Sequence, residues 1–338
     1  MKHTMLLTGD VNLRNVTDPD RPFAHVAETL QGADIVFGNL EGCLYDSEEV
    51  LPYKSGWRHA GTAGARALVR GGFHAVGCAN NVTFGHEAIV SSLAQLDEMG
   101  VEHTGAGVDR ASARAPVVLE RDGVKYGFAQ YTSVYWPIGH EATDTATGVA
   151  AVKAHTAYEP NRRIAEMPGG PPTVVTWPDP DGLADFQQDI QRLRGEADVV
   201  VASFHWGISS SDETAQYQVA LGHAAIDGGA DLVMGHGPHV VQGIEVYNEK
   251  PIFYSLGNFT FGWEKMRRDW VGLVISAEVE DGRVARVSCS PVRPDADGST
   301  AFRSTDQEPE AMEALDRLSQ GFGTSLDLNG ERVGVLSQ

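Results

Sequence analysis

The chain has 338 residues, with 26 lysines and arginines against 46 aspartates and glutamates, a formal net charge of −20 and a pI near 4.9. So acidic a surface repels phosphate backbones and anionic lipid, which argues against binding to nucleic acid or to a membrane through a basic patch. Hydrophobic residues make up 42% of the chain, enough for the core of one large domain or two small ones.

The cysteines and the N-terminal residues indicate the cellular compartment in which we expect the protein. Cys43, Cys78 and Cys289 are too few and too scattered for a disulfide framework or a Cys-x-x-Cys metal site, which favours a reducing compartment. The first residues lack the apolar stretch and the small-residue cleavage signal of a secretion signal. No run approaches the roughly 20 apolar residues of a membrane-spanning helix. We therefore expect a cytoplasmic protein.

Short apolar runs alternate with segments of helical spacing over the first two thirds of the chain, which predicts a sheet covered by helices. Strands are expected at residues 5–7, 34–37, 75–78, 126–130, 199–204 and 232–234. Helices are expected at residues 23–30, 63–69, 88–99, 183–193 and 214–227.

The pattern changes after Gly243, where strands follow one another with only turns between them. They are expected at residues 244–247, 252–254, 271–279 and 284–288. Residues 131–160 and 168–180 are expected to form long loops, which in a compact domain are often functional. A polar tail with a surface helix at 308–318 follows, so we divide the chain into a main domain, 1–293, and a C-terminal extension packed on or flanking it, 294–338.

Polar side chains suited to metal binding follow directly after five of the expected strands, where open α/β sheets place their ligands. They are Asp10 and Asn12, Asn39 and Glu41, Asn80 and Asn81, His205, and His236 and His239. Carboxylate and amide oxygens suit Mn, Mg or Fe, imidazoles suit Zn, Mn or Fe, and a carboxylate can bridge two ions about 3.5–4 Å apart. Each residue alone could be a turn residue, a solvated acid or a buried histidine, but together they predict a metal site.

The motifs at these strand ends resemble, in their order, those of the CapA (poly-γ-glutamate biosynthesis protein) family in the calcineurin-like metallophosphoesterase clan. They are Gly9-Asp10, Asn39-Leu40-Glu41, Ala79-Asn80-Asn81, His205-Trp206-Gly207, Gly235-His236-Gly237-Pro238-His239-Val240 and Ser255-Leu256-Gly257-Asn258-Phe259. The resemblance covers about residues 5–261 and implies a four-layer α/β-β/α sandwich with two divalent metal ions at the strand ends.

The same resemblance implies roles for single residues. Asp10 would ligate one metal ion, and Glu41 would take the position of the carboxylate that bridges the two ions. The coordination shells of both ions would be completed by Asn81, His205, His236 and His239. Asn12 stands where many clan members have histidine, so it is at most a weak ligand. We assign it to substrate binding, together with Asn80, Trp206, Asn258 and Tyr135. For Trp206 and Tyr135 the alternative is packing at the rim, and for Asn258 a plain turn.

One position departs from the family pattern. The family often reads Asn-Asn-His, and the clan uses that histidine to protonate the leaving group of a phosphoester, but here the residue is Val82. Valine cannot transfer a proton, which removes a contribution of roughly 10²–10⁴-fold in rate. His86 is the nearest replacement, because the start of a helix favours a neutral, basic imidazole. Cys78 and Cys43 are further candidates for acid/base catalysis, although a surface histidine and two small buried hydrophobic residues would explain all three.

These observations favour a metal-dependent enzyme acting on a peptide or poly-γ-glutamate-like substrate through a metal-polarised carbonyl. Attack by water would give amide hydrolysis or transfer, whereas two opposed acid/base groups could instead exchange the Cα proton and epimerise the residue. Epimerisation is preferred because it needs no leaving-group acid, and the resemblance implies that the scaffold supports it. The alternatives are a metal-dependent phosphoester hydrolase and a non-catalytic metal-binding component of capsule polymer biosynthesis. The metal (Mn, Zn, Fe or Mg), the substrate and the oligomeric state stay open.

Overall fold

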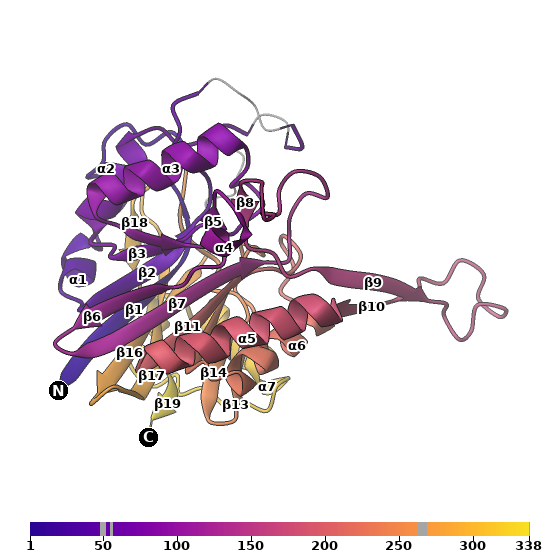
Figure 1. Ribbon diagram of the computed structural model, residues 1–338. Helices are drawn as coiled ribbons and strands as arrows, with labels where there is room; N and C mark the ends of the chain where they lie inside the picture. Colours follow the sequence, from indigo (N-terminus) through magenta and orange to yellow (C-terminus); the bar gives the residue numbers. More distant parts are fainter. Residues whose placement is uncertain (48–51, 55–56, 263–268, 338) are drawn as a thin grey trace.

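The computed structural model describes residues 1–47, 52–54, 57–262 and 269–337, and its centre is a pair of β-sheets packed face to face (Figure 1). The first sheet has the order β18-β17-β16-β1-β2-β3-β4, with β15 also paired to β1 and β19 to β17. Its strands are β1 (Lys2–Asn12), β2 (Ile35–Leu40), β3 (Ala75–Gly77), β4 (Glu102–Thr104), β15 (Asn258–Phe261), β16 (Gly272–Glu280), β17 (Arg283–Pro294), β18 (Thr300–Phe302) and β19 (Val333–Ser337).

The second sheet has the order β13-β14-β12-β11-β7-β6. Its strands are β6 (Val117–Arg121), β7 (Val124–Thr132), β11 (Val199–His205), β12 (Leu232–His236), β13 (Ile244–Tyr247) and β14 (Lys250–Phe253). β1 and β2 run parallel in the first sheet, as do β7, β11 and β12 in the second, and these strands are apolar on both faces because both faces are covered. Between the sheets the rings of Phe37 and Phe128 stack at 4.6 Å.

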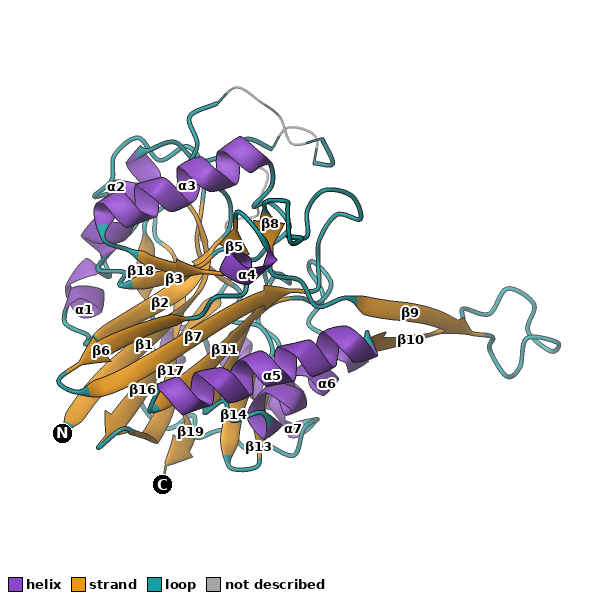
Figure 2. Ribbon diagram, viewed as in Figure 1, coloured by secondary structure: helices purple, strands orange, loops and turns teal. Residues whose placement is uncertain are grey.

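Helices cover both outer faces, so the layer order is the expected α/β-β/α sandwich of the calcineurin-like fold (Figure 2). The first sheet carries α1 (Ala27–Gln31), α2 (Ala63–Gly71) and α3 (His86–Met99), and the second carries α5 (Pro180–Glu196) and α6 (Gln216–Asp227). Shorter connecting elements are α4 (Arg110–Ala113), the 3-10 turn η1 (Thr305–Gln307) and the strand pair β5 (Ala106–Gly107) with β8 (Gly148–Val149).

The structure corrects the expectation of two long loops. Residues 131–160 and 168–180 contain β8, β9 (Ala154–Glu159) and β10 (Thr173–Pro178), and β9 and β10 pair as a hairpin that projects from the sandwich (Figure 1). Three of the six side chains of β9 are exposed and none is fully buried, so the hairpin lacks the alternation of buried and exposed residues that marks a strand in a sequence. The expected helix at 23–30 is also shorter, because it begins only at Ala27.

The segment after residue 293 adds to the first sheet and to the core. β18 and β19 both hydrogen-bond to β17. Helix α7 (Pro309–Gln320) buries Met312 and Leu315 in the cluster between the sheets. The division at 293/294 stays a prediction. Within the described part of the chain, we find no helix with both the length and the apolar character needed to cross a bilayer.

Candidate metal centre

Carboxylates from the first sheet meet imidazoles from the second at the strand ends. Asp10 lies on β1 and Glu41 directly after β2, while His236 ends β12 and His239 follows it. The Nδ1 atoms of His236 and His239 lie 3.4 and 3.2 Å from the Asp10 carboxylate. Donor atoms of Asp10, Glu41 and His239 all lie within 4.8 Å of one another, which is close enough to share one divalent ion.

The Asp10 carboxylate is fully buried and held by several donors. Asn39 donates to it from Nδ2 at 2.7 Å, and the backbone N–H of Gly237 donates at 3.4 Å. Burial by itself would raise the pKa of Asp10, but the two neighbouring imidazoles outweigh burial and lower the pKa well below its usual range. Asp10 is therefore ionised, which is the form that ligates a metal.

The other ligand candidates differ in protonation. Burial raises the pKa of Glu41 to about 7. Burial alone would lower the pKa of His239, but the carboxylates of Glu41, 3.7 Å away, and Asp10 raise it to about 9. Burial lowers the pKa of His205 to about 3, so its imidazole is neutral. His239 therefore places a positive charge beside the carboxylates of Asp10 and Glu41, and a bound metal cation would replace that charge.

If these residues bind a metal, their buried polar atoms should lack hydrogen-bond partners within the protein. Among the described residues, no hydrogen bond reaches the buried carboxylate oxygens of Glu41, the Oδ1 atom of Asn81, or either ring nitrogen of His205 and His236. Each unsatisfied buried polar group costs about 1–3 kcal/mol, and a charged one more. Seven such atoms at one edge of the sandwich fit a divalent metal with mixed oxygen and nitrogen ligands.

Close backbone approach brings the last strand into the centre. β15 pairs with β1 so that Asn258 lies beside Asp10, and the Asp10 N–H donates to the Gly257 carbonyl at 2.9 Å. A Cβ atom on Gly9 would lie 2.3 Å from that carbonyl oxygen, so only glycine fits there. Asn258 then reaches the Nδ1 atom of His239 with its Oδ1 atom at 3.1 Å.

The residues assigned to substrate binding have mostly internal contacts. Asn12 donates from Nδ2 to the Glu41 carbonyl at 2.9 Å. Asn80 donates from Nδ2 to the Leu40 carbonyl at 2.8 Å and caps the turn that carries Asn81. These asparagines hold the ligand loops in place. Trp206 is fully buried and donates to the carbonyl of Tyr254, so the structure places its indole in the core and not at a substrate-facing surface.

The remaining candidates occupy different environments. Cys43 and Cys78 are core residues, and burial raises the pKa of Cys43 to about 12 and raises that of Cys78 as well. His86 is exposed as the first residue of α3, where its Nδ1 atom lies 2.7 Å from the Thr147 hydroxyl. Tyr135 is half-buried in the loop after β7, and burial raises its pKa to about 12.

One residue that positions Asp10 through Asn39 is missing from the sequence-based assignment. The Gln130 amide is buried between the sheets and donates from Nε2 to Asn39 Oδ1 at 2.9 Å, while Asn39 in turn donates to Asp10. Gly77 makes room for it, because a Cβ atom there would lie 2.3 Å from the Gln130 amide. Asn39 stands inside a motif, but Gln130 is marked only by its place at the end of a predicted strand.

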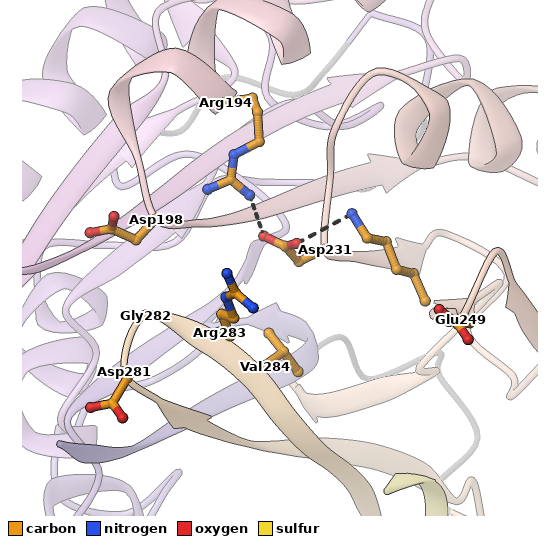
Figure 3. A pocket seen from close by; sticks show the side chains of 9 residues that line it. Arg194, Asp198, Asp231, Glu249, Asp281, Gly282, Arg283 and Val284 are labelled. Carbon is orange, nitrogen blue, oxygen red and sulfur yellow. Dashed lines mark hydrogen bonds and ion pairs between the residues drawn. The ribbon is translucent and has the colours of Figure 1, made fainter. Parts of the chain in front are cut away.

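A separate charged cavity of about 450 Å³ lies at the opposite ends of the strands, where β11, β12 and β17 begin (Figure 3). Its basic groups are largely neutralised internally, because Asp231 accepts Arg194 at 2.7 Å and Lys250 at 3.3 Å. The ligand candidates are not among the residues that line it. It therefore belongs to a different part of the molecule from the metal centre.

The chain is similar in sequence to a family of bacterial proteins. Residues 4–263 match the family described as "Bacterial capsule synthesis protein PGA_cap". The protein y4sH of Sinorhizobium fredii (strain NBRC 101917 / NGR234) is 30% identical over 312 residues, covering 76% of this chain and 66% of that protein. "Capsule biosynthesis protein CapA" of Bacillus anthracis is 28% identical over 284 residues, covering 79% of this chain and 62% of that protein.

Two further comparisons complete these findings. "PGA biosynthesis protein CapA" of Bacillus subtilis (strain 168) is 28% identical over 254 residues, covering 73% of this chain and 59% of that protein, so this chain spans about 60% of the length of the CapA relatives. A hypothetical protein from Thermus thermophilus superposes with a TM-score of 0.48 at 16% identity, covering 85% of this chain and 98% of that one. The chain belongs to the bacterial capsule synthesis protein family PGA_cap.

Proposed function

We propose that this protein is a metal-dependent enzyme that acts on a peptide or poly-γ-glutamate-like chain, and that it epimerises a Cα centre in preference to cleaving an amide. The observation that carries the proposal is the set of buried ligand atoms on Glu41, Asn81, His205 and His236 that lack a hydrogen-bond partner among the described residues. With Asp10 and His239 they provide enough donors for two divalent ions, for which Mn, Zn, Fe and Mg are the candidates.

The substrate class is supported by the relatives, whose names refer to capsule and PGA biosynthesis. A chain of glutamyl units offers a carbonyl beside each Cα, which a divalent ion at this centre would polarise, making the Cα proton more acidic. Cys43, Cys78 and Cys289 are free and buried, which supports a reducing compartment such as the cytoplasm.

Val82 separates this site from an ordinary phosphoesterase. Its side chain is fully buried and packs against Trp57, so the position carries no proton donor for a leaving group. Epimerisation needs none, because a base removes the Cα proton and an acid returns a proton to the opposite face, with no net change in atoms. We assign one of these transfers to His86, whose Nδ1 atom is engaged by Thr147 and whose Nε2 atom is left to move the proton.

The test is Cα exchange in deuterated water. The Mn-loaded protein is incubated with γ-linked glutamate oligomers and with α-linked glutamyl peptides, and products are analysed for mass and chirality. We expect a gain of one mass unit per exchanged centre and the appearance of the opposite enantiomer. His86→Ala should slow exchange at least about tenfold.

The matched control is His103→Ala, which removes an imidazole paired with Asp97 near the other end of α3 and should leave exchange unchanged. Shorter products without deuterium would indicate hydrolysis. Turnover of an aryl phosphodiester without Cα exchange would replace the proposal with phosphoester hydrolysis. Fewer than about one bound Mn per chain would contradict a metal-dependent function altogether.

A further inference from the structure

The hairpin of β9 and β10 forms an arm that projects from the sandwich (Figure 1). Its two strands pair only with each other and make a sheet of their own. Tyr158 on β9 lies opposite Val174 on β10, and the two side chains are 68% and 53% exposed. A sheet of two strands is at best marginally stable in water, whereas three or more strands are stable. The arm therefore has both the exposed apolar side chains and the need for a further strand that mark a contact with another chain.

The outer edge of β9 is open. Thr176 lies opposite Thr156 in the ladder, and its N–H donates away from β9, to the Gln216 side-chain oxygen at 3.0 Å. In an antiparallel ladder both members of such a pair point away from each other, so Thr156 directs its N–H and C=O outward, as do Ala154 and Tyr158. Across the described ranges, none of these three N–H groups has a hydrogen-bond partner. The edge of β10, in contrast, is partly closed by Gln216.

The charges that flank β9 suit the same strand of a second copy. Lys153 precedes the strand and Glu159 ends it, both side chains are exposed, and neither has an ion-pair partner among the described residues. When two copies of β9 run antiparallel about a twofold axis at Thr156, their outward-facing peptide groups meet. In this register Lys153 of each copy lies opposite Glu159 of the other, which gives two pairs of opposite charge.

We propose that the outer edge of β9 is a dimerisation surface, at which the arms of two copies of this chain join into one sheet of order β10-β9-β9-β10. The joined sheet satisfies the outward peptide groups and brings the exposed Tyr158 beside Ala154 of the second copy. Because the two strands run antiparallel, the tip of each arm, with the exposed Arg162, lies toward the body of the other copy. A basic tip suits the surface of a chain of net charge −20. This inference is independent of the reaction at the metal centre.

The first test asks whether this edge carries the dimer. Sedimentation equilibrium of the full chain at high protein concentration should give twice the chain mass of 36.3 kDa. Thr156→Pro removes an outward N–H and places a ring at the edge, but it spares the β9–β10 ladder because that N–H does not donate to β10. We expect it to weaken dimerisation at least about 100-fold. Thr156→Ser, the matched control that keeps the N–H, should dimerise as the wild type does.

The second test asks whether the register is the proposed one. Lys153→Glu and Glu159→Lys each turn both opposite-charge pairs into like-charge pairs, so each variant alone should dimerise about tenfold more weakly. An equimolar mixture of the two variants should recover the association, because every lysine then faces a glutamate across the heterodimer. Glu98→Lys, a charge reversal at an exposed site on α3, is the matched control and should leave dimerisation unchanged.

The contradicting outcomes are distinct from one another. A wild-type chain that stays monomeric at every concentration would overturn the proposal, even if the arm binds another protein or peptide. A dimer that persists in a folded Thr156→Pro variant would place the interface elsewhere and overturn it too. If circular dichroism shows that Thr156→Pro does not fold, the exposed charge variants decide, and equal dimerisation of wild type, single variants and mixture would overturn the proposed pairing.

Discussion

At the scale of single residues, the orientation of Asp10 depends on a relay of amide side chains. Gln130 donates to Asn39, and Asn39 donates to Asp10 Oδ1. The other end of the Gln130 amide accepts the N–H of Ala79, in the segment that leads to Asn81. One buried side chain thus fixes a carboxylate of β1 and the ligand loop after β3 together, which is the kind of contact that tunes metal affinity.

We predict that Gln130→Leu weakens Mn binding about 10- to 100-fold, because Asn39 loses its donor and Asp10 its fixed orientation. Titration of the metal-free protein followed by calorimetry measures this. Gln218→Leu is the control, since Gln218 is equally buried but belongs to α6 and bonds to Ala215 and Gln242. If both variants bind Mn as the wild type does, Gln130 is a packing residue and does not position the ligands.

At the scale of elements, one histidine joins the loop after β3 to the loop after β7. His140 is buried, accepts the N–H of Trp136 on Nδ1 at 3.0 Å, and donates from Nε2 to the Thr83 carbonyl at 2.9 Å. Trp136 in turn donates from its indole to the Asn81 carbonyl. This geometry requires neutral His140, because a proton on Nδ1 would face the donor N–H of Trp136.

Burial lowers the pKa of His140 to about 4, from an ordinary value near 6.5. Between pH 4 and pH 6.5 the unfolded chain binds a proton on His140 that the folded chain excludes. The stability that neutral His140 contributes is therefore fully present above pH 6.5 and is lost as the pH falls. From pH 7 to pH 5 the loss amounts to about 2 kcal/mol. We measure the free energy of unfolding in urea between about pH 7 and pH 5. We predict that the loss of about 2 kcal/mol is absent from His140→Gln and is retained in His103→Gln. Equal pH profiles for wild type and His140→Gln would contradict the prediction.

At the scale of the whole molecule, the C-terminal segment is built into the sandwich. β18 and β19 extend the first sheet, and α7 buries Met312 and Leu315 against the core between the sheets. This segment lies beyond residues 4–263, the part of the chain matched by the family. Its packing indicates that the region after residue 293 contributes to the stability of the sheets as well as flanking them.

We predict that Leu315→Ala lowers the free energy of unfolding by about 2–5 kcal/mol, the usual cost of truncating a buried leucine. Glu313→Ala, on the exposed face of the same helix, should change it by no more than about 0.5 kcal/mol. Denaturant unfolding of both variants measures the difference. A small effect of Leu315→Ala would support a separable extension at residues 294–338.

The candidate ligands come from both sheets, so a metal ion bound by them would link the sheets. Binding of Mn to the folded state alone should therefore stabilise the whole molecule, by about 2.7 kcal/mol when free Mn is 100 times the dissociation constant. We expect the melting temperature to rise by several degrees with Mn and to fall back with a chelator. Asp10→Asn should abolish the rise and Asp281→Asn, an exposed acid far along the chain, should preserve it. A rise of equal size in Asp10→Asn would mean that Mn acts elsewhere.

The sequence by itself determined the alternation of strands and helices, the four-layer architecture through the family motifs, and the strand ends at which Asp10, Glu41 and His236 lie. These are local properties, because apolar runs and glycine-flanked ligands are contiguous in the chain. Only the tertiary structure brought Gln130 to Asn39 and Arg14 to Trp57, and placed Trp206 in the core. Such contacts join residues far apart in sequence, and the β9–β10 hairpin has exposed side chains with no periodic signal, so neither could be predicted from the order of residues alone.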